Sequence, residues 1–166
     1  MPATLEQRIK RLEDIEAIRL LVGRYAHGAD RNNDPQIMGA LLADDAVWEA
    51  PGFGRYEGRD EITRQLARIG REEILWSLHY MVSPVIEVAP SGQSARCHWY
   101  LWELAKMPGG DGAQSHWIGG CYHSELIETA AGWRFSHVLL NLKLNSRYSE
   151  GWQSQPSTTQ KTPTEN

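Results

Sequence analysis

The second half of the chain consists of four long strand-like segments, and this feature constrains the fold most. They cover residues 74–88, 95–106, 116–129 and 133–147 and are rich in β-branched and aromatic side chains. The segments between them are short and contain Gly, Pro, Ser and Asp, which favour turns. Because short turns join antiparallel neighbours, the sequence predicts an antiparallel meander.

The first half of the chain predicts mainly helices. Apolar residues recur every three or four positions over residues 5–26, which indicates an amphipathic helix that ends near Gly28. The pair at 34–35, Asp then Pro, is typical of the start of a second, short helix. A strand over 46–50 and a helix over 60–69 follow. Helices followed by a meander predict an α+β fold in which N-terminal helices pack on a cone-shaped, curved antiparallel sheet and enclose a pocket.

The length predicts a single domain. A chain of 166 residues is large enough for one hydrophobic core. We expect residues 1–150 to form that domain. Residues 151–166 are rich in Ser, Thr, Gln and Pro, and we expect them to form a disordered tail.

Charge and composition exclude several classes of partner. The net charge is −4 and no basic block is present, so we expect no nucleic acid as partner. No apolar run approaches the ~20 residues that cross a bilayer, and the N-terminus lacks the layout of a signal peptide, so no membrane partner is expected. The two cysteines, Cys97 and Cys121, cannot form a disulfide framework, which favours a cytoplasmic location.

Two residues are candidates for acid–base chemistry. Asp30 follows the expected end of the first helix, where it is either a functional carboxylate near Tyr25 or a solvated turn residue. His79 lies in an apolar strand, where strand alternation groups it with Ser77 and Met81. An imidazole there needs a partner, either a buried carboxylate or a backbone group. Neither the histidine spacing nor any glycine-rich motif indicates a metal or cofactor, so we expect none.

Several short motifs resemble the SnoaL-like branch of the nuclear transport factor 2-like superfamily. The resemblance runs from about Leu5 to Arg147 and includes Asp30 and Tyr25 after the segment Ile15-Glu16-Ala17-Ile18-Arg19. The other motifs are Leu42-Ala43-Asp44-Asp45-Ala46-Val47-Trp48, Gly58-Arg59-Asp60-Glu61-Ile62 and Gly132-Trp133-Arg134-Phe135. This branch includes scytalone dehydratase, bile acid 7α-dehydratase and hexachlorocyclohexane dehydrochlorinase.

The resemblance implies a cofactor-independent lyase. In such enzymes an aspartate and a histidine act as a dyad in an elimination, and by position these are Asp30 and His79 here. Tyr25 matches a catalytic tyrosine or lysine, and Lys143 falls where relatives carry an arginine on the last strand. The alternatives are a ketosteroid-type isomerase or polyketide cyclase, and a non-catalytic dioxygenase small subunit or ligand-binding protein.

The aromatic side chains predict a hydrophobic substrate, of aromatic, polyketide or steroid-like kind. The chain has seven Trp and six Tyr against two Phe, which suits the lining of a small-molecule pocket or the filling of a core. The expected substrate-binding residues are Trp48, Tyr100, Trp102, Trp117 and Tyr122, with Trp76 and Trp99 as further wall candidates. An open sheet that exposes Trp and Tyr needs covering, and relatives assemble, so we expect a homodimer or homotrimer.

Overall fold

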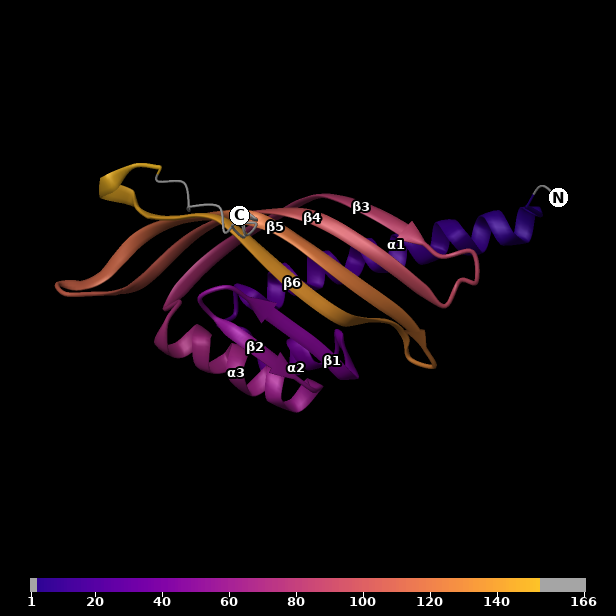
Figure 1. Cartoon of the computed structure of the whole chain (residues 1–166), viewed down its shortest axis with the longest axis horizontal. Helices are drawn as coiled ribbons and strands as arrows, with labels where there is room; N and C mark the ends of the chain where they lie inside the picture. The colour runs from indigo at the N-terminus through magenta and orange to yellow at the C-terminus, as the bar shows by residue number, and fades with distance from the viewer. Residues whose placement is uncertain (1–2, 153–166) are drawn as a thin grey trace, which may run out of the picture.

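The computed structural model describes residues 3–152 and places helices before a long meander (Figure 1). The prediction of a disordered tail falls mostly on residues that lie outside this range. The helices are α1 (Leu5–Ala29), α2 (Pro35–Gly39) and α3 (Arg59–Glu72), with a short 3-10 turn at Tyr148–Glu150. The strands are β1 (Leu42–Ala50), β2 (Gly54–Glu57), β3 (Trp76–Val88), β4 (Ser94–Gly109), β5 (Gly112–Thr129) and β6 (Gly132–Arg147).

The six strands form one sheet in the order β2-β1-β6-β5-β4-β3. The meander from β3 to β6 is antiparallel as predicted. One pair departs from the antiparallel pattern, because β1 lies parallel to β6 and thereby joins the first half of the chain to the second. Strand β2 was not predicted, since a four-residue strand that starts with a glycine at φ 110° carries almost no periodic signal.

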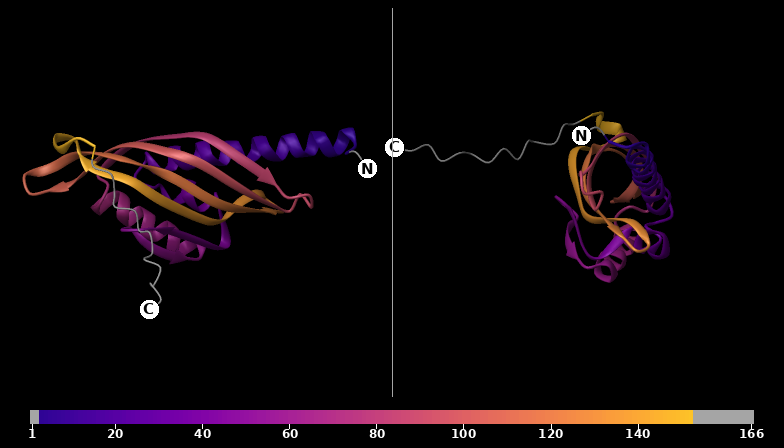
Figure 2. Two further views of the ribbon diagram at one scale, coloured as in Figure 1. Left: turned by 45° about the horizontal axis from the view of Figure 1, so that its top comes forward. Right: turned by 90° about the vertical axis from the view of Figure 1, so that its right-hand side faces the viewer.

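The sheet curves around an interior that the helices close (Figure 2). Helix α1 packs on the concave face against β3 and β6, while α3 and α2 cover the side formed by β1. Viewed along the long axis of the molecule, the curved sheet and the helices surround one interior, as the sequence predicts. This arrangement confirms the α+β class.

Helix α1 begins with a capping box, in which Thr4 and Gln7 exchange side-chain to backbone hydrogen bonds. It continues past its expected end at Gly28 and stops at Asp30, which is its C-cap. A Cβ atom at position 28 would lie 2.6 Å from the Met38 sulfur. Gly28 is therefore needed for the close approach of α2, and not for helix termination.

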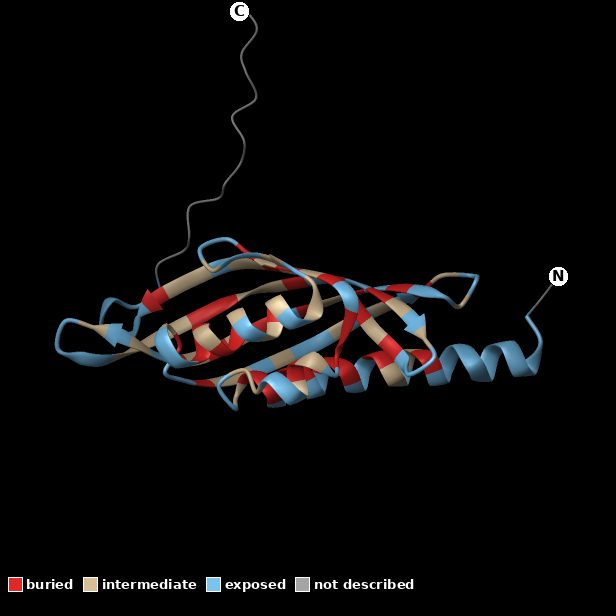
Figure 3. Cartoon of the chain, turned by 90° about the horizontal axis from the view of Figure 1, so that it is seen from below, coloured by how far each residue is buried: buried red, intermediate tan, exposed pale blue. Residues whose placement is uncertain are grey.

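The first turns of α1 extend beyond the sheet, and Leu5 and Leu12 there are exposed (Figure 3). Asp14 anchors the next part of the helix. Its carboxylate is buried, accepts the indole N–H of Trp133 at 2.9 Å and pairs with Lys10. A buried carboxylate with two donors is stabilised, because its desolvation is compensated by charge-assisted hydrogen bonds.

Replacing Trp133 with phenylalanine tests this anchor. An aromatic ring is kept, but part of its buried volume is lost and Asp14 loses its donor from β6. We expect the free energy of unfolding to fall by about 1–3 kcal/mol, the range for leaving a buried polar group short of a partner. Urea denaturation followed by circular dichroism measures this loss. Since Tyr148 is exposed, Tyr148→Phe serves as the control and should cost little.

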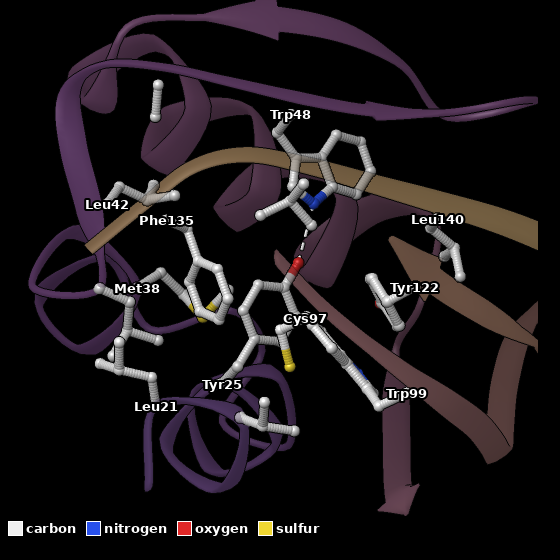
Figure 4. Packing of buried hydrophobic residues seen from close by; sticks show 14 of the residues in the cluster. Leu21, Tyr25, Met38, Leu42, Trp48, Cys97, Trp99, Tyr122, Phe135 and Leu140 are labelled. Atoms are coloured by element: carbon white, nitrogen blue, oxygen red, sulfur yellow. Dashed lines mark hydrogen bonds between the residues drawn. The ribbon is translucent and has the colours of Figure 1, made fainter. Parts of the chain in front are cut away.

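The core consists of aromatic and aliphatic side chains between the sheet and α1 (Figure 4). Trp99 is fully buried and stacks on Tyr122 with ring centroids 4.8 Å apart. Tyr25 meets both rings and Phe135 edge-on. Within residues 3–152, no helix combines the length and apolar character that crossing a membrane requires.

Candidate active site

Asp30 and His79, distant in sequence, meet where α1 ends beside β3. The backbone of Asp30 still belongs to the helix, because its N–H donates to the Ala26 carbonyl at 2.9 Å. Its carboxylate oxygen Oδ1 accepts the backbone N–H of His79 at 2.9 Å and lies 2.8 Å from the Nδ1 atom of the same residue. Because a carboxylate only accepts, Nδ1 carries a hydrogen and the lone pair of the neutral ring is at Nε2.

The other side of the imidazole faces Glu103, a residue that the sequence analysis missed. Glu103 lies directly opposite His79 in the β3–β4 ladder, and its Oε2 is 3.4 Å from His79 Nε2. Only 5% of Glu103 is exposed. Burial raises the pKa of this carboxyl, the charge of Asp30 raises it further, and His79 opposes both effects. The sequence signal that could have identified Glu103 is its charge within an apolar strand, at the position that alternates with Leu101 and Ala105.

His79 and Glu103 line a cavity between the sheet and the helices. Its enclosed volume is about 60 Å³, and about 560 Å³ when the open space at its mouth and between the lining side chains is counted. Aromatic and aliphatic side chains form most of the wall, and His79, Glu103, Ser77 and Asn33 add polar atoms. The apolar lining residues are Tyr25, Ala29, Trp48, Phe53, Leu66, Ile69, Gly70, Ile74, Ile118, Tyr122, Leu140 and Leu142. A small molecule with an aromatic or alicyclic body fits such a lining.

Tyr25 projects from α1 into the same cavity. Its hydroxyl oxygen accepts the indole N–H of Trp48 at 2.8 Å (Figure 4) and is also hydrogen-bonded to the Tyr122 hydroxyl. Burial raises the pKa of Tyr25 to about 12, so the phenol stays protonated at neutral pH. Tyr25 can therefore act as a hydrogen-bond donor to an oxygen in the cavity.

Lys143 lies outside the cavity, contrary to the expectation from the resemblance. Leu142 points inward, and a bulge in β6 leaves Lys143 without a partner in the ladder, exposed on the outer face. There its charge helps to lower the pKa of His123, after the effects of burial and of His98. Lys143 is therefore not among the residues that line the cavity with His79.

Three of the expected substrate-binding aromatics also lie on the outer face. Tyr100 is 56% exposed, and Trp102 packs against Trp117 with ring centroids 5.3 Å apart. Strand alternation explains the difference, because Glu103 and Leu101 take the inward positions of β4. Of the named aromatics, Trp48 and Tyr122 line the cavity. Of the two further candidates, Trp76 is half exposed and Trp99 lies in the core behind Tyr122.

The raised pKa of Glu103 predicts a pH-dependent cost in stability. The groups that face it are His79, Asp30, Tyr25 and Tyr122. The folded state binds the Glu103 proton more tightly than the unfolded state, so its stabilising contribution is complete below the ordinary pKa of 4.5 and is lost as the pH rises through the folded-state pKa. Glu103→Gln does not ionise and should therefore gain stability relative to wild type as the pH rises from 4 to 8.

Thermal unfolding at a series of pH values measures this gain. We expect the difference in Tm between Glu103→Gln and wild type to grow with pH, by about 2–4 °C for each kcal/mol of stability that ionisation of Glu103 removes. The exposed carboxylate variant Glu125→Gln is the control and should show no such growth. A difference in Tm that does not change with pH would contradict the assignment.

Comparison with known proteins supports this reading of the fold. The sequence model of the SnoaL-like domain matches residues 10–138. The structure of hexachlorocyclohexane dehydrochlorinase LinA-type3 from Novosphingobium barchaimii superposes with a TM-score of 0.77 at 21% identity, over 90% of this chain and 99% of that one. No curated protein matches the sequence significantly.

Two structures from Novosphingobium aromaticivorans are also similar. One carries the provisional name scytalone dehydratase, with a TM-score of 0.73, 20% identity, and coverage of 85% of this chain and 91% of that one. The other is described as an ntf2-like protein with a cystatin-like fold, with a TM-score of 0.67, 24% identity, and coverage of 83% and 87%. At these identities the likeness establishes the fold.

Proposed function

The chain belongs to the SnoaL-like domain family, and on that basis we propose that it is a cofactor-independent lyase that eliminates a leaving group from a hydrophobic small molecule. The observation that carries this proposal is the contact of Asp30 with His79 Nδ1 inside an apolar cavity. An imidazole oriented by a carboxylate, with its other nitrogen facing the cavity, is suited to take a proton from carbon. Similar structures named as a dehydrochlorinase and a dehydratase agree with elimination chemistry.

In the proposed mechanism His79 is the general base. Its Nε2 removes a proton from a carbon next to a carbonyl group, and Asp30 stabilises the imidazolium that forms. One Asp30 oxygen contacts both the ring Nδ1 and the backbone N–H of His79, so the ring and the strand that carries it are held before substrate binds. General acid–base catalysis of this kind contributes about 10²–10⁴-fold for each positioned group.

Tyr25 is proposed to bind the carbonyl oxygen on which negative charge develops. Its oxygen accepts from Trp48, and we assign Tyr122 as the donor in the contact between the two phenols, which leaves the Tyr25 O–H available to donate. Hydrogen bonds aimed at developing charge in a cavity that excludes water stabilise the transition state. The aromatic rings of Phe53 and Tyr122 then offer surfaces for the apolar body of the substrate.

An elimination assay with a simple aromatic ketone tests the proposal. The probe is the β-hydroxyketone formed by aldol addition of acetone to benzaldehyde, whose dehydration gives the ultraviolet-absorbing enone benzalacetone. We expect wild type and Lys143→Ala to form the enone at similar rates, and His79→Ala to form it at the buffer rate. An isomerase would instead yield products of unchanged mass, and equal rates for wild type and His79→Ala would contradict a lyase that uses this histidine.

We also propose that the outer face of the sheet is covered by further copies of the chain in a homodimer or homotrimer. Large apolar side chains lie exposed on neighbouring strands of this face, among them Tyr80 and Val82 on β3 and Tyr100 on β4. An apolar surface of this kind is costly in water. Size-exclusion chromatography with light scattering should give a multiple of 18.8 kDa, whereas a monomer at micromolar concentration would contradict the assembly.

A further inference from the structure

We propose that Glu103 is a second catalytic residue, the acid that protonates a departing oxygen, and that the substrate is therefore a β-hydroxy carbonyl compound. This inference rests on the proposed lyase function and names the leaving group for it. It predicts that the substrate bound in the cavity loses water and not a halide.

The positions of the two side chains support separate roles, with His79 as the base and Glu103 as the acid. Glu103 and His79 lie side by side on adjacent strands, both line the cavity, and their facing atoms Oε2 and Nε2 are 3.4 Å apart. Asp30 occupies the opposite side of the imidazole and does not line the cavity. A substrate that places its C–H bond at Nε2 therefore brings the neighbouring carbon's substituent within reach of the Glu103 carboxyl.

The surroundings of Glu103 favour the neutral acid. Among the described residues that line the cavity there is no lysine or arginine to balance a negative charge. The other polar groups facing it are the carboxylate of Asp30, the ring of His79, and two phenols, Tyr25 and Tyr122. A buried carboxyl close to another carboxylate retains its proton to higher pH, which agrees with the raised pKa of Glu103.

The proposed step balances in atoms and charge. His79 Nε2 takes the proton from the carbon next to the carbonyl, the electron pair of that C–H bond forms the double bond, and the C–O bond breaks. The leaving oxygen takes the Glu103 proton and departs as water. His79 is then an imidazolium and Glu103 a carboxylate, and transfer of one proton from Nε2 to Oε2 restores both. The short separation of these atoms allows that transfer without another group.

The leaving group follows from the same chemistry. Hydroxide is a poor leaving group and gains greatly from protonation, whereas chloride departs without a proton. An acid placed beside the base is thus useful for loss of water and dispensable for loss of chloride. The relative rates for the two leaving groups on one carbon skeleton report whether Glu103 acts as an acid.

The experiment compares the β-hydroxyketone with its β-chloro analogue, since both give benzalacetone. In Glu103→Gln, which keeps the shape but not the acidic proton, we expect the ratio of hydroxyl to chloride elimination to fall about 10²-fold or more. Glu103→Asp, which retains an acid, should recover part of that ratio. Glu125→Gln on the outer face of the sheet is the control and should leave the ratio at the wild-type value. A ratio in Glu103→Gln equal to that of wild type would overturn the proposal.

A second measurement does not depend on turnover. Infrared difference spectra between wild type and Glu103→Gln at neutral pH should show a carboxylic acid C=O band that the variant lacks. A carboxylate band in its place would overturn the acid role of Glu103, whatever the assay shows. If the acid band is present and wild type eliminates neither leaving group, the proposed lyase function fails while the protonation state of Glu103 stands.

Discussion

Replacing His79 with alanine is expected to lower the rate of elimination about 10²–10⁴-fold, because the variant has lost the base that takes the proton from carbon. The exposed residue His27 provides the matched control, and His27→Ala should keep the wild-type rate. Circular dichroism and thermal unfolding establish that both variants are folded. The rate of enone formation from the β-hydroxyketone is the measurement.

Asp30→Asn should cause a loss of similar size for a different reason. The amide removes the charge that stabilises the imidazolium and no longer fixes the hydrogen at Nδ1, and the equivalent change in a Ser-His-Asp triad costs about 10⁴-fold. Because both residues act as one unit, the double variant should be no slower than about the slower single variant. If the rate reductions of the two single variants multiplied in the double variant, the two residues would act independently and not as a dyad. Asp111→Asn, in an exposed turn, is the control for removal of a carboxylate.

Replacing Trp99 with alanine is expected to lower the free energy of unfolding by about 3–5 kcal/mol, the cost of a large cavity in a core. Trp99 is fully buried, stacks on Tyr122 and lies 5.8 Å from the Phe135 ring centroid. Its indole nitrogen has no hydrogen-bond partner in the described part of the chain. Trp99→Phe should therefore cost much less than Trp99→Ala, since only ring volume is lost.

Urea denaturation of the two variants measures these costs. If Trp99→Ala lost less than about 1 kcal/mol, the packing of β4 against α1 would be looser than the structure indicates. The same ring supports Tyr122, which lines the cavity. If the elimination rate of Trp99→Ala falls by more than the loss of folded protein explains, Trp99 also positions Tyr122 in the cavity wall.

The meeting of Asp30 and His79 was predicted from the family resemblance, and two local sequence signals are consistent with it. The helical periodicity places the end of α1 near Asp30, and strand alternation places Ser77 and His79 on one face of β3. Both faces follow from short-range backbone geometry. The resemblance then adds that these two elements lie together, and their contact agrees with that expectation.

The inward face of β4 could not be predicted in the same way. Its two faces are both apolar, with Trp99 and Leu101 on one and Tyr100 and Trp102 on the other, so alternation alone does not distinguish core from surface. Glu103 was missed for the same reason. In β6, the bulge at Lys143 shifts the register of the ladder by one residue, and such bulges leave little trace in hydrophobic patterning.

The central claim is that His79, held by Asp30, takes a proton from carbon, and deuterium exchange tests it most directly. Benzylacetone has the acidic carbon of the assay substrate but no leaving group, so in heavy water it reports proton removal alone. We predict that wild type and Glu103→Gln speed deuterium uptake next to the carbonyl, and that His79→Ala and Asp30→Asn leave it at the buffer rate. Uptake by His79→Ala as fast as by wild type would contradict the account.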